Sequence, residues 1–161
     1  MVKFTSEQKS IERMDNMVLE EKKVKNICNF YVSEYHLEIM LLPYISKKID
    51  DKENIVIITE KDLRKTLKDV IEKINLDQDK KEKIKNLSWN TQNIENIIQN
   101  SNVIIIGNKN FINEEIVKLK GKQIENLKII ACYDYNEVKD EMKEIVTKYE
   151  VVLNTLGIDN I

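Results

Sequence analysis

The stretch ICNFYV at residues 27–32 decides the fold, because it is a short apolar run that leads directly into an amphipathic helical pattern. The same succession occurs three more times, with apolar runs at residues 55–59, 103–106 and 129–133. Strands that helices cover on both faces have unbroken apolar sequences, as in parallel sheets. We therefore predict an α/β fold, a three-layer sandwich around a mostly parallel sheet of four or five strands.

The composition limits the class of protein. With 161 residues the chain has the size of one domain and is long enough to bury a core. Its net charge is -2, whereas general nucleic-acid binders usually carry a basic excess, so we expect no nucleic-acid partner. No apolar run is long enough to span a bilayer, and the first residues lack the apolar segment of a signal peptide. We expect a cytoplasmic protein without membrane contact.

The chain is expected to consist of an N-terminal helix, residues 1–25, and a single α/β domain, residues 26–161. In the first part, Ile11, Met14 and Val18 recur at helical spacing. The second part is expected to end in a long helix that starts near Asn136 and has Gly157 as its C-cap. The first and last helices are the predicted surfaces for protein contact or dimerisation.

Helices are also expected between the strands, at residues 34–49, 61–74, 77–85, 93–100 and 113–119. Pro43 lies inside the first of them and predicts a kink or a split, because proline lacks an N–H and clashes with the preceding turn. Leu87 and Trp89 indicate a brief edge strand.

Polar side chains follow each apolar run, and they form the candidate ligand site. In an open α/β sheet the carboxyl ends of the strands line one edge, and ligands bind where the strand order reverses. The predicted ligand-binding residues are Tyr31, Ser33 and His36; Thr59 and Glu60; Asn108 and Lys109; and Tyr133 and Asp134. Ser33 and Thr59 also suit helix capping and turns.

Complete catalytic motifs are missing from the sequence. There is no phosphate-binding loop of the G-x-x-x-x-G-K-[ST] or G-x-G-x-x-G type, and the chain has only three glycines. Cys28 and Cys132 lie within predicted strands, so we expect buried core thiols, and their spacing does not suit zinc. His36 is the only imidazole, and its place favours a crevice rim over a nucleophile–base pair. We predict no catalytic residue, no metal and no cofactor.

Short motifs in the chain resemble MEDS domains. NICNFY at residues 26–31 and LLPYI at residues 41–45 are similar to the family's H-x-C-x-F-Y-like strand and the L-x-P-[YF]-like segment of the following helix. ACYD at residues 131–134 is similar to its C-x-Y-D strand. The resemblance covers about residues 26–140, although Asn26 stands where the family has histidine, and the Arg-rich stretch after Y-D is absent.

The resemblance implies a RecA-like fold with a degenerate P-loop, used for sensing small hydrocarbon-derived molecules together with histidine kinases or transcription regulators. The leading hypothesis is a non-enzymatic regulatory or sensory module that binds a small ligand and a protein partner, and that can also form a homodimer. One alternative is a small α/β enzyme that uses Asp134 or His36 as acid or base. Another is a purely structural dimerisation or interaction protein.

Overall fold

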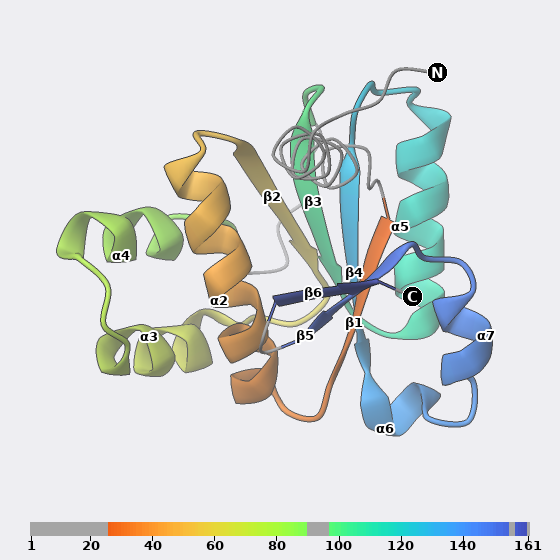
Figure 1. Ribbon diagram of the computed structural model, residues 1–161, viewed down its shortest axis with the longest axis horizontal. Coiled ribbons are helices and arrows are strands. Elements are labelled where there is room, and N and C mark those ends of the chain that lie inside the picture. Colours follow the sequence, from red (N-terminus) through yellow and green to blue (C-terminus); the bar gives the residue numbers. More distant parts are fainter. Residues whose placement is uncertain (1–25, 90–96, 155–156, 161) are drawn as a thin grey trace, which may run out of the picture.

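The computed structural model describes residues 26–89, 97–154 and 157–160, and it places one sheet between two layers of helices (Figure 1). The strand order is β2-β3-β4-β1-β5-β6. The first five strands in this order are parallel, and β6 is antiparallel to β5. The bounds are β1 Asn26–Tyr31, β2 Asn54–Thr59, β3 Ser101–Ile106, β4 Lys128–Asp134, β5 Val151–Asn154 and β6 Gly157–Asn160. The predicted three-layer α/β sandwich is confirmed, and the arrangement is consistent with a RecA-like one.

Helices α2, α3 and α4 cover one face of the sheet, and α5, α6 and α7 cover the other (Figure 1). Their bounds are α2 Glu34–Asp50, α3 Arg64–Lys73, α4 Gln78–Lys85, α5 Lys109–Gly121, α6 Tyr135–Val138 and α7 Met142–Val146. On β3, Ile104 packs against the first layer and Ile105 against the second. Because alternate residues of a strand point to opposite faces, each strand contributes to both cores. This is why the central strands have apolar residues at nearly every position.

The carboxyl ends of β1 and β4, called the β1–β4 crevice from here on, are the topological switch point of the sheet. The chain leaves β1 through α2 and returns at β2, whereas it leaves β4 through α6 and α7 and returns at β5 on the other side of β1. The loops after β1 and β4 therefore part at the carboxyl end of the sheet, which is the lower end in Figure 1. In the β1–β4 pair, Tyr31 lies opposite Asp134 and Phe30 opposite Tyr133. Ligand sites of open α/β sheets form at such a point.

Helix α2 is continuous through Pro43, so the predicted split does not occur. The proline leaves the carbonyl of Ile39 without its helical N–H partner. Ile39 is 50% exposed, so water can bind that carbonyl. Buried residues on both sides of the proline, such as Leu37 and Ile45, pack in the same core and hold the two halves of the helix together.

The predicted long C-terminal helix is wrong. After the short helices α6 and α7, the chain forms β5 and β6, and Gly157 begins β6 instead of ending a helix. Val151 pairs with Ile27 of β1, and the N–H of Glu150 donates to the carbonyl of Asn26 at 3.1 Å. A strand here satisfies backbone groups on one edge of β1, which a helix would leave unpaired.

The structure differs from two further predictions in the middle of the chain. Residues 87–89 form no strand, because Trp89 is buried and links two helices instead. Its indole N–H donates to the carbonyl of Ile84 at 2.7 Å, and its carbonyl accepts the N–H of Leu63 at 2.8 Å. Of the helix predicted at 93–100, residues 97–100 are not helical and the rest lies outside the described residues, as does the helix predicted within 1–25.

Candidate functional site

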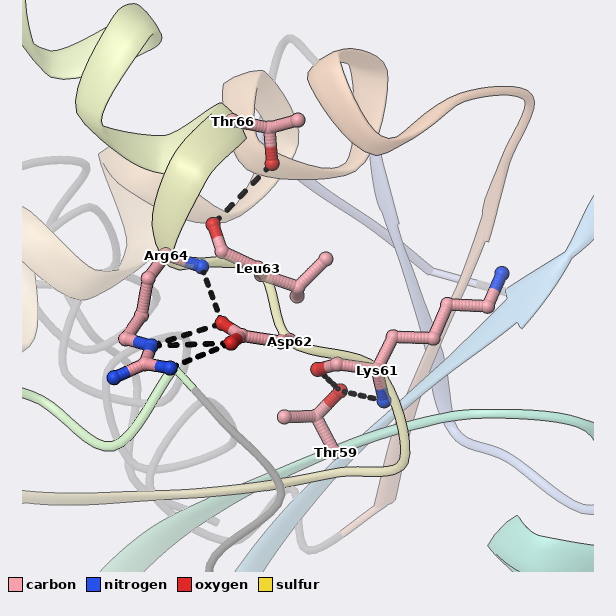
Figure 2. Close-up of polar contacts among 6 residues, drawn as sticks. All are labelled: Thr59, Lys61, Asp62, Leu63, Arg64 and Thr66. Carbon is pink, nitrogen blue, oxygen red and sulfur yellow. Dashed lines mark hydrogen bonds and ion pairs between the residues drawn. The ribbon is translucent and has the colours of Figure 1, made fainter.

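The loop from β2 into α3 is held by its own polar side chains (Figure 2). The hydroxyl of Thr59 accepts from the N–H of Lys61 at 3.1 Å and donates to the Lys61 carbonyl at 2.8 Å. The carboxylate of Asp62 accepts from the N–H of Arg64 at 3.1 Å and pairs with its guanidinium at 2.7 Å. These hydrogen bonds lower the pKa of Asp62 to about 2. The polar groups of this loop are thus engaged in shaping the turn and the start of α3.

The N-terminus of α5 is closed by carboxylates of the chain itself. Glu60 accepts the N–H of Asn108 at 2.5 Å, and Glu137 accepts the N–H of Lys109 at 2.9 Å. The side chain of Asn108 accepts the N–H of Phe111 at 2.8 Å as the N-cap. Helix N-termini bind phosphate through such N–H groups. Because carboxylates already use these donors, this part of the sheet edge is unsuited to phosphate.

Gly107 permits this closure. A Cβ atom at position 107 would lie 2.5 Å from the ring of Phe111 and 2.8 Å from Oε1 of Glu60, both too close for real contacts. The ammonium group of Lys109 forms an ion pair with Glu141 at 3.0 Å. The predicted site residues Glu60, Asn108 and Lys109 therefore lie together, and their polar groups join the loops after β2 and β3 to the segment after β4.

Ser33 and His36 cap α2. The Oγ of Ser33 accepts the N–H of His36 at 3.1 Å, and Nδ1 of His36 accepts the N–H of Val32 at 3.0 Å. This second bond assigns the ring proton to Nε2. Both side chains lie at the rim of the crevice, where they stabilise the turn between β1 and α2.

Tyr133 and Asp134 are neighbours in β4 but point to opposite faces of the sheet. The hydroxyl of Tyr133 lies 2.6 Å from that of Tyr149, and its ring stacks on Phe30 with centroids 5.8 Å apart. Tyr133 thus belongs to the core beneath α5 and α7. Asp134 is on the α2 side, and it accepts the N–H of Asn136 at 2.9 Å as the N-cap of α6. Of the two, Asp134 is the one beside Tyr31 in the crevice.

The α2 side of the β1–β4 crevice holds Tyr31 and the buried, unpaired side chain of Asn29. Tyr31 is only 3% exposed, and its hydroxyl makes no hydrogen bond with any residue in the described part of the chain. Asn29, two residues earlier on the same face, is fully buried, and neither its Oδ1 nor its Nδ2 has a partner among the described residues. Buried polar atoms normally have hydrogen-bond partners. These two side chains therefore mark the candidate ligand site.

Negative charge surrounds the Tyr31 hydroxyl. Burial is the main reason why the pKa of Tyr31 is raised, and the Cys132 thiol and the carboxyl groups of Asp134, Glu137 and Glu34 raise it further. These groups come from β4, from α6 and from the first turn of α2. The crevice is thus acidic and combines carboxylates with an uncommitted hydroxyl.

Glu38 on α2 is a second buried polar group with unmet hydrogen bonding. It is fully buried, one of its oxygens contacts the hydroxyl of Thr66, and the other has no partner among the described residues. Burial raises its pKa to about 7; the bond to Thr66 opposes the rise, and the charges of Glu34 and Asp69 add to it. The Thr66 hydroxyl also lies 3.2 Å from the carbonyl of Leu63 (Figure 2). Thr66 has a single hydroxyl hydrogen, so it donates to Glu38 or to the Leu63 carbonyl at any one time.

The two cysteines lie on neighbouring strands but on opposite faces of the sheet. The β1–β4 register pairs Cys28 with Ala131 and Cys132 with Asn29, an offset of one residue. Because the faces alternate, the two thiols belong to different cores and cannot form a disulfide. Burial raises the pKa of Cys28 to about 12 and also raises that of Cys132. Burial thus keeps both groups as thiols, which are poor nucleophiles.

Sequence reasoning missed Asn29 and Glu38. Each has a local signal, because Asn29 is the polar residue in the middle of an apolar run, and Glu38 lies between Leu37 and Leu41 on the apolar face of a helix. A charged or amide side chain at such a position is costly to bury unless a partner compensates for it. Polar residues within otherwise apolar segments of the sequence would therefore have pointed to the crevice and to the contact between α2 and α3.

Residues 26–89, 97–154 and 157–160 contain neither a metal-binding cluster nor a membrane-spanning helix. In this part of the chain no three His, Cys, Asp or Glu residues come together in a way that could hold a metal ion. The helices described there include none with the length and apolar character needed to cross a membrane.

The fold defines a class: a three-layer α/β protein with a buried amide and several carboxyl groups at its topological switch point. No family model, no curated protein and no solved structure matches the chain.

Proposed function

We propose that this chain is a non-enzymatic cytoplasmic regulatory or sensory module that binds a small ligand in the β1–β4 crevice and acts on a protein partner. The observation that carries the proposal is Asn29, which is fully buried with both amide atoms unpaired, together with Tyr31 on the same face of β1 at the switch point. A ligand that completes these bonds gains their full strength, because the protein has already removed the groups from water.

The state of the candidate catalytic groups favours binding over chemistry. Burial disfavours the thiolates of Cys28 and Cys132. Asp134 and His36, the acid–base candidates of the enzyme alternative, both accept hydrogen bonds from backbone N–H groups. A general base must have its lone pair directed at a substrate proton, and the contact with Val32 engages the Nδ1 lone pair of His36.

The resemblance to MEDS domains favours the same role, with a histidine kinase, a transcription regulator or a second copy as partner. A ligand regulates such a module only if it binds one conformation better than another. Val32 and Tyr35 follow Tyr31 closely and are 57% and 47% exposed. A ligand beside Tyr31 would therefore act on a turn that is also accessible to a partner.

The test is a thermal-shift screen of the full chain against nucleotides and small metabolites, with the mass in solution measured by light scattering. A ligand that binds only the native state raises the unfolding midpoint by mass action. The key variant is Tyr31→Phe, which removes an unpaired hydroxyl. The matched control is Tyr149→Phe, which removes a buried hydroxyl that is bonded to Tyr133.

We expect a ligand whose shift is lost in Tyr31→Phe and retained in Tyr149→Phe. Without ligand, Tyr31→Phe should be about as stable as the original chain, because it breaks no hydrogen bond with a residue that the structure describes. Conversion of the ligand to a product, detected by mass spectrometry, would instead support the enzyme alternative. Equal ligand shifts in both variants would place the site elsewhere and contradict the proposal.

A further inference from the structure

We infer that the crevice binds a small organic cation, a primary amine whose ammonium group lies between Tyr31 and Asp134. This inference rests on the proposed function, because it names the ligand class of the same site. It follows from the register of two strands, the unmet hydrogen bonds and the sign of the surrounding charge.

The register brings four side chains together on one face of the β1–β4 pair. Asn29 lies opposite Cys132, and Tyr31 lies opposite Asp134, and all four point to the α2 side. Neighbouring strands are about 4.8 Å apart, and residues two apart along a strand are separated by roughly 6.6 Å. One small polar group can therefore contact both strands.

The acceptors in this patch suit an ammonium group. Tyr31 offers a hydroxyl oxygen, Asn29 an amide oxygen and Asp134 a carboxylate, and an ammonium group has three hydrogens to donate. The oxygens of Asn29 and Tyr31 have no other partner among the described residues. Asp134 accepts one backbone N–H at its Oδ1, and a carboxylate has further lone pairs available.

The surrounding charge selects a cation over an anion. The carboxyl groups that act on the Tyr31 hydroxyl belong to Asp134, Glu137 and Glu34, and no lysine or arginine of the described part is among the groups that act on it. The one contact of Glu137 shown is with a backbone N–H, which leaves its negative charge in place. Like charges at close range would repel a phosphate or carboxylate ligand.

The N-terminus of α2 does not reverse this preference. Helix N-termini attract anions through their unpaired N–H groups. Here the N–H of His36 is bonded to the side chain of Ser33, that of Leu37 to the Ser33 carbonyl, and that of Val32 to the ring of His36. These three N–H groups are therefore satisfied within the turn, and the carboxyl group of Glu34 adds a negative charge to the first turn of α2.

Exposed apolar residues directly follow both Tyr31 and Asp134 in the chain. Val32 directly follows Tyr31, and Tyr135 directly follows Asp134, and they are 57% and 38% exposed. Apolar surface at the rim can cover an alkyl or aromatic body, and an aromatic face also attracts a cation. The inferred ligand thus has one ammonium group and a short apolar body.

The experiment compares ligands that differ only in charge. Butylamine, butanol and butyrate share one alkyl body, as do phenethylamine, phenethyl alcohol and hydrocinnamate. Each is titrated into the full chain by calorimetry at constant ionic strength, followed by the variants Asp134→Asn and Tyr31→Phe. The change to asparagine keeps an oxygen to cap α6, so the local fold is retained. Glu125→Gln, in the loop before the amino end of β4, is the control for the loss of one negative charge.

We expect an amine to bind while its alcohol and its carboxylate do not. Asp134→Asn should weaken amine binding at least roughly tenfold, since it removes a charge-assisted hydrogen bond, and Glu125→Gln should leave it unchanged. Equal effects of Asp134→Asn and Glu125→Gln would show non-specific attraction and overturn the inference.

Different results would contradict the proposed function and the proposed ligand class. If the alcohol or the carboxylate binds and this binding is lost in Tyr31→Phe, the inference of an amine ligand is overturned. The proposal of a ligand-binding module is then retained. Failure of every amine, together with no response to any compound in the metabolite screen, would overturn both. Circular dichroism of each variant without ligand confirms that it is folded.

Discussion

The buried carboxyl group of Glu38 makes the stability of this protein depend on pH, and the substitution Glu38→Gln tests this. In the unfolded chain the group ionises near its ordinary pKa of 4.5, whereas in the folded protein its pKa is about 7. Between these values the unfolded state releases the proton and the folded state keeps it. Rising pH therefore favours the unfolded state, and the contribution of Glu38 to stability is lost as the pH increases through this window.

The magnitude follows from the size of the shift. A change from 4.5 to about 7 corresponds to roughly 3.4 kcal/mol in total, at about 1.36 kcal/mol per unit of pKa. About 2.5 kcal/mol of this should appear between pH 5 and pH 8. Glutamine has nearly the same shape and no charge, so it stands in for the protonated side chain throughout. Glu38→Gln should accordingly gain stability relative to the original chain as the pH rises.

The assay is urea denaturation of both proteins from pH 5 to pH 8, with the difference in the free energy of unfolding plotted against pH. Taking the difference removes the contributions of all other titrating groups. Thr66→Val provides a second check, because the bond to Thr66 lowers the pKa of Glu38. Without that hydroxyl the pKa of Glu38 in the folded protein should rise, so the loss of stability should extend to higher pH. Parallel curves for the original chain and Glu38→Gln would refute the reasoning.

Three other substitutions or reagents test the packing. Tyr149→Phe leaves a buried hydroxyl on β4 without its partner at 2.6 Å, so urea denaturation should show a loss of about 1–3 kcal/mol; an unchanged midpoint would contradict the bond. Gly107→Ala places a Cβ 2.5 Å from the ring of Phe111, and we expect a lower melting temperature and a cost of about 1–3 kcal/mol; no change would show that the ring moves without cost. Cys28 and Cys132 should react with Ellman's reagent only after unfolding, and rapid reaction in the native protein would disprove their burial.

Much of the fold could be predicted from local pattern. An apolar run such as Val103 to Ile106 is long enough for a strand and too short for a helix, and it has no polar residue for a solvent-exposed face. The helix at residues 77–85 was also predicted well, because Asp77 caps it as α4. These features depend on residues that are close in the sequence, so the sequence contains the whole physical cause.

The C-terminal segment could not be predicted in the same way. Val138, Met142, Ile145 and Tyr149 recur at helical spacing, but the chain turns after α7. Two distant contacts favour the strand: the Tyr149 hydroxyl bonds to Tyr133, and β5 pairs with β1. The run at residues 151–153 was the one local sign of a strand, and it is too short to outweigh the helical spacing.

For the candidate site, too, the sequence determined one part and the tertiary structure determined the other. By itself the sequence determined that polar residues follow each strand and that phosphate-binding loops are absent. Only the tertiary structure decided that β1 and β4 are neighbours, and that Tyr31 shares a face with Asp134 and with the buried Asn29. Strand order and register depend on contacts between residues about a hundred positions apart. A shift of one residue in that register would reverse every side chain of a strand, so no local pattern can specify which side chains meet.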